Sequence, residues 1–355
     1  MTMLAETVDA VIGIDTHRDT HEVEIADPAG KPIATLQVSN DSNGFTQLLA
    51  AIAELAPGPR MAVSIEGSRS YGIGLARALA AAGLLVIECE QPSRKQRRGK
   101  GKSDPIDAHL AVLAALRLDT TRLPVPRADG DREALRILLV ARQEITTART
   151  AQASRLRALL LTGDDSDRQA ARGALTQRIL TGLAGRTVPA GARRDHAIRQ
   201  AEIARLALAL GQARRQLKDN HRQLQAIVND IAPGLTSRYG IGPVSAAQAI
   251  VSFSHPGRCR NEAAFAALGG TSPIPASSGQ TVRHRLNRGG DRALNHAIHA
   301  IAVTRIRSCA RTRAYIARRT AEGKTAREIR RCLKRYIARE LYRQLTQSMN
   351  PPVSP

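Results

Sequence analysis

The chain has 355 residues, with 53 lysines and arginines against 31 aspartates and glutamates, so its formal net charge is +22. This length leaves room for two or three domains of roughly 100–200 residues, and no apolar run reaches the ~18–20 residues that cross a bilayer. The amino terminus lacks the basic-then-apolar layout of a signal peptide, and the four cysteines show no Cys-x-x-Cys spacing. These features argue against a secreted or integral membrane protein and favour a reducing, cytoplasmic compartment.

The positive charge predicts a polyanionic partner, because lysine and arginine bind polyanions by releasing counterions. Nucleic acid is the first expectation and an anionic membrane surface the second; a generally arginine-rich proteome is the alternative that needs no partner. Aromatic residues make up 2% of the chain and tryptophan is absent, so stacking of bases on aromatic rings is not the main binding mode. We expect contacts mainly with backbone phosphates.

The first 125 residues alternate between strand and helix patterns. Strands are expected at 8–15, 21–26, 32–38, 60–66 and 84–89, and helices at 43–55, 71–82 and 104–118. A turn at Asp27-Pro-Ala-Gly joins the second and third strands, so these should form a hairpin beside the first. The order β-β-β-α-β-α-β-α predicts a mixed sheet with helices on its faces, the α/β layout of the ribonuclease H-like fold.

Residues 126–232 are expected to form a long helical middle region. Apolar residues recur with a period near 3.5 across 132–161 and again across 196–231, and a connection rich in Gly, Asp and Arg runs from 162 to 194. Two such helices predict an antiparallel hairpin or a coiled-coil dimerisation element. A plain helical linker is the alternative.

Residues 233–345 should form a mainly α carboxyl-terminal domain, followed by a tail at 346–355. The segment around Gly240 and Gly242 resembles a helix-hairpin-helix turn, in which glycines let backbone N–H groups approach a phosphate. Fourteen lysines and arginines but only three acids lie between Arg305 and Arg343. That stretch predicts an exposed pair of basic helices.

Four acids fall where a single metal site would need them. Asp15 ends the first strand and Glu66 ends the fourth, and these two strands are neighbours in the ribonuclease H-like fold. Asp104 and Asp107 are three residues apart, so they share one face of the first turn of a helix. Each acid alone could be a cap or a surface residue, but together they would repel unless cations neutralised them. Oxygen ligands favour Mg²⁺ or Mn²⁺, and two such ions can support phosphoryl transfer.

A run of basic residues directly precedes Asp104. The residues expected to contact phosphate there are Arg94, Lys95, Arg97, Arg98, Lys100 and Lys102. A solvated charge run is the usual alternative for such a stretch. The pairs His17 with His21 and His296 with His299 have spacings that can suit a metal, but each lacks a third ligand. We therefore expect these histidines at the surface or on phosphates, and not on zinc.

Seven short blocks carry a family resemblance when taken in order. They are Ile-Gly-Ile-Asp15-Thr-His-Arg-Asp, Glu66-Gly-Ser-Arg-Ser-Tyr71-Gly-Ile-Gly-Leu, Lys102-Ser-Asp104-Pro-Ile-Asp107-Ala, Tyr239-Gly-Ile-Gly-Pro-Val-Ser-Ala, Phe265-Ala-Ala-Leu-Gly-Gly-Thr-Ser-Pro273, Ser277-Ser278-Gly279 and Arg288-Gly-Gly-Asp-Arg-Ala-Leu. The ordered set resembles the DEDD-type transposases of bacterial insertion sequences, family one hundred and ten. Ser103 stands where threonine is commoner, and Arg69 where a small residue is usual.

The resemblance implies a division of labour between two domains. Residues 1–125 would be a RuvC-like catalytic domain in which Asp15, Glu66, Asp104 and Asp107 bind metal. Residues 233–345 would be a transposase domain whose serine attacks DNA and forms a phosphoserine link. Ser278 is the expected nucleophile and Ser277 the fallback. The flanking phosphates would be held by Arg283, Arg285, Arg288 and Arg292.

The resemblance also implies partners. Family members are guided to donor and target DNA by a structured noncoding bridge RNA, and they work as dimers that pair into tetramers with an active site composed from two protomers. Two other functions remain open from the residues alone. One is a RuvC-like, junction-resolvase type of nuclease that uses activated water; the other is a nucleic-acid-binding protein with a degenerate site.

Overall fold

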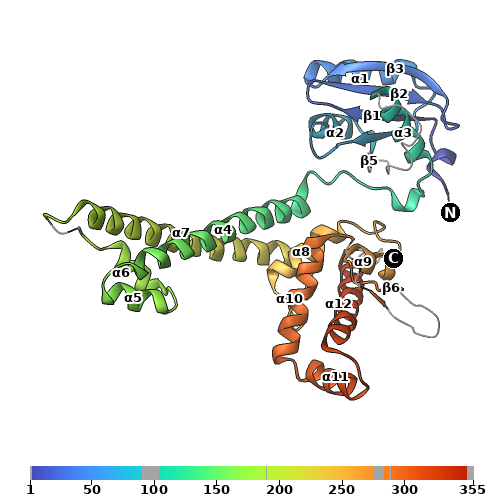
Figure 1. Ribbon diagram of the computed structural model, residues 1–355. Coiled ribbons are helices and arrows are strands. Elements are labelled where there is room, and N and C mark those ends of the chain that lie inside the picture. Colours follow the sequence, from blue (N-terminus) through green and yellow to red (C-terminus); the bar gives the residue numbers. More distant parts are fainter. Residues whose placement is uncertain are drawn as a thin grey trace.

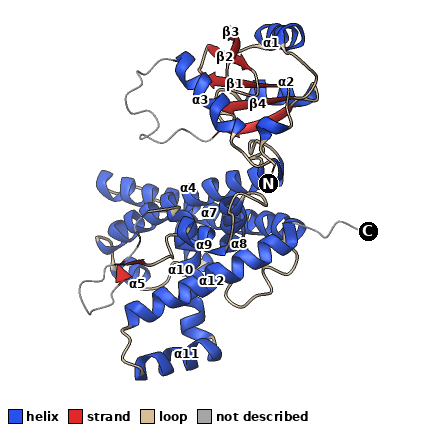
Figure 2. Cartoon of the chain, turned by 90° about the vertical axis from the view of Figure 1, so that its right-hand side faces the viewer, coloured by secondary structure: helices blue, strands red, loops and turns tan. Residues whose placement is uncertain are grey.

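A computed structural model of the protein describes residues 2–89, 104–188, 190–275, 284–285, 287 and 289–349. It consists of an α/β amino-terminal domain, a long arm of two antiparallel helices, and a helical carboxyl-terminal region (Figure 1). The arm extends away from the other two parts, which lie at its base. Figure 2 shows that the strands gather almost entirely in the amino-terminal domain.

The amino-terminal domain is built on a five-stranded mixed sheet in the order β3-β2-β1-β4-β5. Its strands are β1 (Ala10–Thr16), β2 (Thr20–Ala26), β3 (Pro32–Ser39), β4 (Met61–Glu66) and β5 (Leu85–Cys89). β1 pairs antiparallel with β2 and parallel with β4, and β4 pairs parallel with β5. The predicted hairpin and the predicted neighbourhood of the first and fourth strands are both confirmed.

Side chains that alternate along the strands divide the apolar residues between two faces of the sheet. On one face, Ile12 and Ile65 pack with α1 (Ser42–Leu55) and α2 (Ile73–Ala81). On the other face, Val11 and Ala62 pack with α3 (Asp104–Leu116). Helices therefore cover both sides of the sheet, with α1 and α2 on one face and α3 on the other.

The arm is formed by α4 (Gly130–Leu161) and α7 (Arg194–Ile231), which pack side by side in opposite directions. Near its base, Asn220 Nδ2 donates to the Leu138 carbonyl oxygen at 2.8 Å, and Arg142 Nη1 donates to that of Leu217 at 3.2 Å. The predicted antiparallel hairpin is confirmed. Its tip differs from the expected plain connection, because α5 (Asp165–Arg172) and α6 (Gln177–Ala184) form there and pack on the arm.

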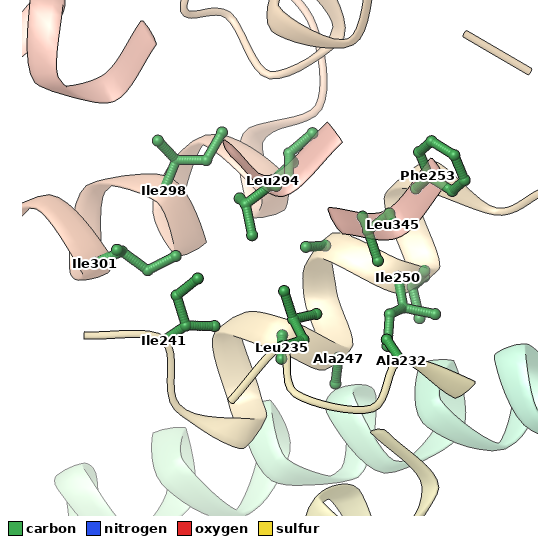
Figure 3. Close-up of a cluster of buried hydrophobic side chains, with 14 of the residues drawn as sticks. Ala232, Leu235, Ile241, Ala247, Ile250, Phe253, Leu294, Ile298, Ile301 and Leu345 are labelled. Carbon is green, nitrogen blue, oxygen red and sulfur yellow. The ribbon is translucent and has the colours of Figure 1, made fainter. Parts of the chain in front are cut away.

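The carboxyl-terminal region contains α8 (Pro243–Phe253), α9 (Glu262–Leu268), α10 (Arg292–Ser308), α11 (Ala310–Ala321) and α12 (Ala326–Met349). Two short strands, β6 (Ile274–Pro275) and β7 (His284–Arg285), pair antiparallel. Its apolar core joins α8, α10 and α12 to the base of the arm (Figure 3). The basic stretch from Arg305 to Arg343 thus spans three helices and not the expected pair.

Among the described residues, no helix combines the length and the apolar character that crossing a membrane requires.

Candidate active site

Two carboxylates lie side by side on the face of the sheet that α3 covers. Asp15 on β1 shares the orientation of Val11, and Glu66 on β4 shares that of Ala62, because side chains two or four residues apart point the same way. The register pairs Ile14 with Ile65, one residue before each acid. Both acids are buried, with 7% of each exposed. The predicted convergence of these two strand ends is therefore confirmed.

Helix α3 brings Asp107 to the same face. A Cβ atom placed on Gly13 would lie 2.2 Å from the Ala108 carbonyl oxygen and 2.6 Å from Val112 Cγ2. Since only glycine has no Cβ, Gly13 lets the first turns of α3 lie directly against β1. Asp107, the neighbour of Ala108, is buried to the same degree as the two strand acids. Asp104 is the first residue of α3, and its side chain lies outside the described residues.

The three described acids are gathered on one face without forming a finished ligand cage. Within the described ranges, no three His, Cys, Asp or Glu side chains are close enough together to hold a metal ion. The donor set nevertheless suits a hard cation, since it consists of buried carboxylate oxygens.

The ends of β1 and β4 are tied to each other beside these acids. Thr16 Oγ1 donates to the Glu66 carbonyl oxygen at 2.7 Å, which fixes the two strand ends. His17, whose side chain is partly exposed, has its Nε2 atom 3.2 Å from Asp15 Oδ2. The chain thus places a titratable nitrogen against a candidate catalytic oxygen.

The acidic face extends onto β2, which the sequence did not single out. Glu22 lies opposite Asp15, and Glu24 opposite Gly13, so both share the α3 face. Glu24 is buried, and its Oε1 atom lies 2.6 Å from His109 Nδ1 on α3. The alternation of polar and apolar residues in β2 already indicates that Glu22 and Glu24 share a face. Only the register with β1 shows that this is the face of Asp15.

His21 lies in the interior and not at the surface as expected. It is fully buried, and its ring stacks on Phe45 with centroids 6.3 Å apart. Burial lowers the pKa of its imidazole. Of the second histidine pair, His296 is exposed on α10, while burial and the nearby Lys334 and Arg330 lower the pKa of His299.

Arg69, noted as unusual, has a defined partner. Its Nε atom lies 3.0 Å from Glu88 Oε1 on β5, and Arg127 Nε donates to Glu88 Oε2 at 2.9 Å. Burial opposes ionisation of Glu88, but the hydrogen bond and the charge of Arg127, with the charge of Arg69, hold the pKa of the carboxyl below its ordinary value. Arg69 therefore contacts, from an exposed position, the buried ion pair of Glu88 and Arg127 at the sheet edge.

The residues expected to contact nucleic acid lie in different surroundings. Arg285, in β7, and Arg292, at the start of α10, are both exposed. Gly240 has a φ of +79°, and a Cβ there would lie 3.2 Å from Arg305 Cγ, so it packs against α10; Gly242 faces open space at the start of α8. The predictions outside the described residues concern Arg94, Lys95, Arg97, Arg98, Lys100, Lys102, Ser103, Ser277, Ser278, Arg283 and Arg288.

These features define a class: a protein with a buried acidic face on a mixed sheet, joined to a basic helical region. Comparison with known families narrows the class. Residues 12–163 match the DEDD transposase model of the IS110 type, and residues 232–317 match the model of the IS116/IS110/IS902 transposase family. Together the two matches cover well over half of the chain. The protein belongs to the IS110 family of transposases.

Two curated relatives come from Streptomyces coelicolor. The chain is 27% identical over 164 residues to the mini-circle transposase of IS117, a match that spans 44% of this chain and 39% of that protein. It is 23% identical over 367 aligned positions to a 43.6 kDa protein of insertion element IS110, a match that covers 90% of both.

Proposed function

We propose that the protein is the DNA transposase, or recombinase, of an insertion sequence, and that its amino-terminal domain is a RuvC-like member of the ribonuclease H-like fold. The observation that carries the proposal is the burial of Asp15, Glu66 and Asp107 on the one sheet face that α3 covers. Burying several carboxylates together is costly unless a cation compensates them. A site of this kind is suited to work on phosphodiesters.

Asp15, Glu66, Asp104 and Asp107 would hold Mg²⁺ or Mn²⁺ at this face. When bound, the cation supplies positive charge that stabilises the oxygens developing charge in phosphoryl transfer. The chain's own contribution is to fix the ligands: Thr16 ties the two strand ends together, and Gly13 allows α3 to bring Asp107 near. His17, 3.2 Å from Asp15, can hold a proton at that carboxylate.

The proposed nucleophile is Ser278, with Ser277 as the fallback. Its Oγ atom would form a bond to the phosphorus of a DNA phosphodiester, while the bond from phosphorus to one deoxyribose oxygen breaks. The serine proton passes to a base, and the departing oxygen takes up a proton. The resulting phosphoserine conserves the energy of the ester, so a second DNA hydroxyl can displace the serine and rejoin the strands.

The position of the β6–β7 hairpin supports an active site shared by two protomers. In Figures 1 and 2, the β6–β7 hairpin, which flanks residues 276–283, lies in the carboxyl-terminal region, apart from the sheet of the same chain. A second copy could supply the serine to the acidic face. The arm would then serve as a coiled-coil dimerisation element, and two dimers would form the tetramer that joins donor and target DNA.

The proposed guide is a structured noncoding bridge RNA. The net charge of +22 and the 2% aromatic content support binding of duplex backbones by charge and shape. Base pairing of the RNA with donor and target DNA would then supply the sequence specificity. The surfaces proposed for these contacts include Arg285, Arg292 and the basic stretch from Arg305 to Arg343.

The deciding experiment is a search for a covalent protein–DNA adduct. The full chain, with its copurified RNA, is incubated with target DNA and Mg²⁺ and then denatured. The wild type should yield the covalent adduct and recombinant DNA, and so should the control Asp27→Asn, which changes the turn between β2 and β3. Ser278→Ala and Asp107→Asn should yield neither product. Should Ser278→Ala and Ser277→Ala both still cut DNA, the RuvC-like nuclease that uses activated water would be the correct function.

A further inference from the structure

A cavity adjoins the acidic face, at the junction of the amino-terminal domain with the carboxyl-terminal region. It has a volume of about 250 Å³ and lies between β5, α3 and the loop that follows α8. The lining residues used below are Ser64, Ala114, Arg127, His255 and Arg258. None of them belongs to the acidic site already described.

Much of the cavity wall is apolar, and the charged side chains around it are mostly cationic. Arg127 is held by Glu88, Arg258 Nη1 donates to the Ser252 carbonyl oxygen at 2.5 Å, and Arg132 Nη2 donates to that of Val251 at 3.2 Å. At His255, the charges of Arg127, Arg258 and Arg132 lower the pKa of the imidazole, and the charge of Glu88 raises it. Burial, together with the charges of Arg127 and Arg69, lowers the pKa of Arg132 to about 10. Crowded, half-buried guanidinium groups of this kind favour an anion among them.

Two polar atoms on the cavity wall are buried without a hydrogen-bond partner among the described residues. They are Ser64 Oγ, on a residue that is 1% exposed, and His255 Nε2. Leaving such groups unpaired costs about 1–3 kcal/mol each. A hydroxyl and an imidazole N–H are both donors that suit the oxygens of a phosphate group.

We propose that this cavity binds one phosphate group of a nucleic-acid strand. Ser64 precedes Glu66 by two residues on β4, which places them about 6.6–6.8 Å apart along the strand, on the same face. Glu66 also pairs in register with Cys89, which lines the cavity. A strand cut at the acidic face would therefore have a neighbouring phosphate at this site. The choice of a nucleic-acid strand as the source rests on the proposed function.

The test compares two variants that act on the cavity differently. Ala114→Leu fills it from an exposed helix position where leucine is well tolerated, and Arg258→Gln removes a charge while keeping a donor for Ser252. Arg260→Gln is the matched control, since Arg260 is exposed, two residues away and does not line the cavity. Circular dichroism establishes that each variant is folded.

The first probe is inorganic phosphate, and the readout is the melting temperature in phosphate compared with chloride at equal ionic strength. Phosphate should raise the melting temperature of the wild type and of Arg260→Gln, and this rise should be lost in both cavity variants. An equal rise in Ala114→Leu and the wild type would overturn the proposal.

The second probe is a single-stranded oligonucleotide. Losing one phosphate contact should reduce the slope of log affinity against log salt concentration by about 0.7. Ala114→Leu should show this smaller slope and weaker binding of the oligonucleotide, although it changes no charge. Phosphate stabilisation combined with unchanged oligonucleotide binding would refute the nucleic-acid source. The phosphate measurement needs no DNA chemistry, so it stands even if no covalent adduct forms and the proposed function fails.

Discussion

Replacing Gly13 with alanine should destabilise the amino-terminal domain and disturb the acidic face together. The new Cβ would lie 2.2 Å from the Ala108 carbonyl oxygen, whereas such carbon–oxygen contacts normally measure about 3.3–3.6 Å. Helix α3 must therefore move away from β1 by roughly 1 Å. Overpacking of this kind costs about 1–3 kcal/mol, and the stiffer unfolded chain returns about 0.4–1 kcal/mol. We expect a net loss of about 1.4 kcal/mol.

Hydrogen exchange of the β1 amides is the suitable assay, because a chain of several parts need not unfold in one step. Exchange of these amides should be about tenfold faster in Gly13→Ala, as about 1.4 kcal/mol corresponds to a factor of ten. The control is Gly182→Ala in α6, where no atom lies within 4 Å of the new Cβ. That change should leave β1 unaltered and stabilise α6 by about 0.5–1 kcal/mol. Unchanged exchange in Gly13→Ala would refute the close packing of α3 on β1.

Four further outcomes are expected. Phe253→Ala should cost about 3–5 kcal/mol in urea denaturation, because the buried ring contacts Phe265 and Tyr342; a loss below 1 kcal/mol would contradict the core assignment. Glu88 has a lowered pKa, so its contribution to stability is complete above its ordinary value of 4.5 and is lost as the pH falls towards the lower folded pKa. The difference in free energy of unfolding between the wild type and Glu88→Gln, measured in urea, should thus become smaller below pH 4.5. A difference that stays constant with pH would contradict the lowered pKa of Glu88. His21 also has a lowered pKa, so the folded protein should lose stability as the pH drops below 6.5, where the imidazole takes up a proton on unfolding. In thermal melts at a series of pH values, His21→Gln should reduce this loss. An equal loss in the wild type and in His21→Gln would contradict the lowered pKa. Chelation of divalent cations should abolish DNA cleavage in a gel assay, and added Mg²⁺ should restore it. Cleavage that persists in excess chelator would show that the acidic site is not a metal site.

The sequence was most informative where periodicity and turns agreed. The strand order and the meeting of Asp15 with Glu66 follow from alternation and from the neighbourhood of two parallel strands. Asp107 follows from its place in the first turn of α3. In each case the position of the residue follows from the local sequence pattern and from one rule about which strands or helices are neighbours.

Partners distant in sequence could not be predicted in the same way. Glu88 and Arg127 are 39 residues apart, and nothing in the periodicity of β5 shows which cation it meets. His21 looked like a surface residue because alternation indicates a face without saying what covers it. The helices α5 and α6 have eight residues each, which is too few turns for an apolar period to emerge between the glycines of this segment.

The arm also sets a length scale for the molecule. With 38 residues at 1.5 Å per residue, α7 extends about 57 Å, and Asn220 and Arg142 lock it to α4 near the base. One residue added to a single helix would rotate everything beyond it by about 100° and break its match with the neighbour. Seven residues added to both would move the tip outward by about 10 Å and return it within about 20° of its original facing. The length of the arm can therefore change without rotating the tip only by additions close to whole numbers of turns, such as seven residues, made in both helices at once.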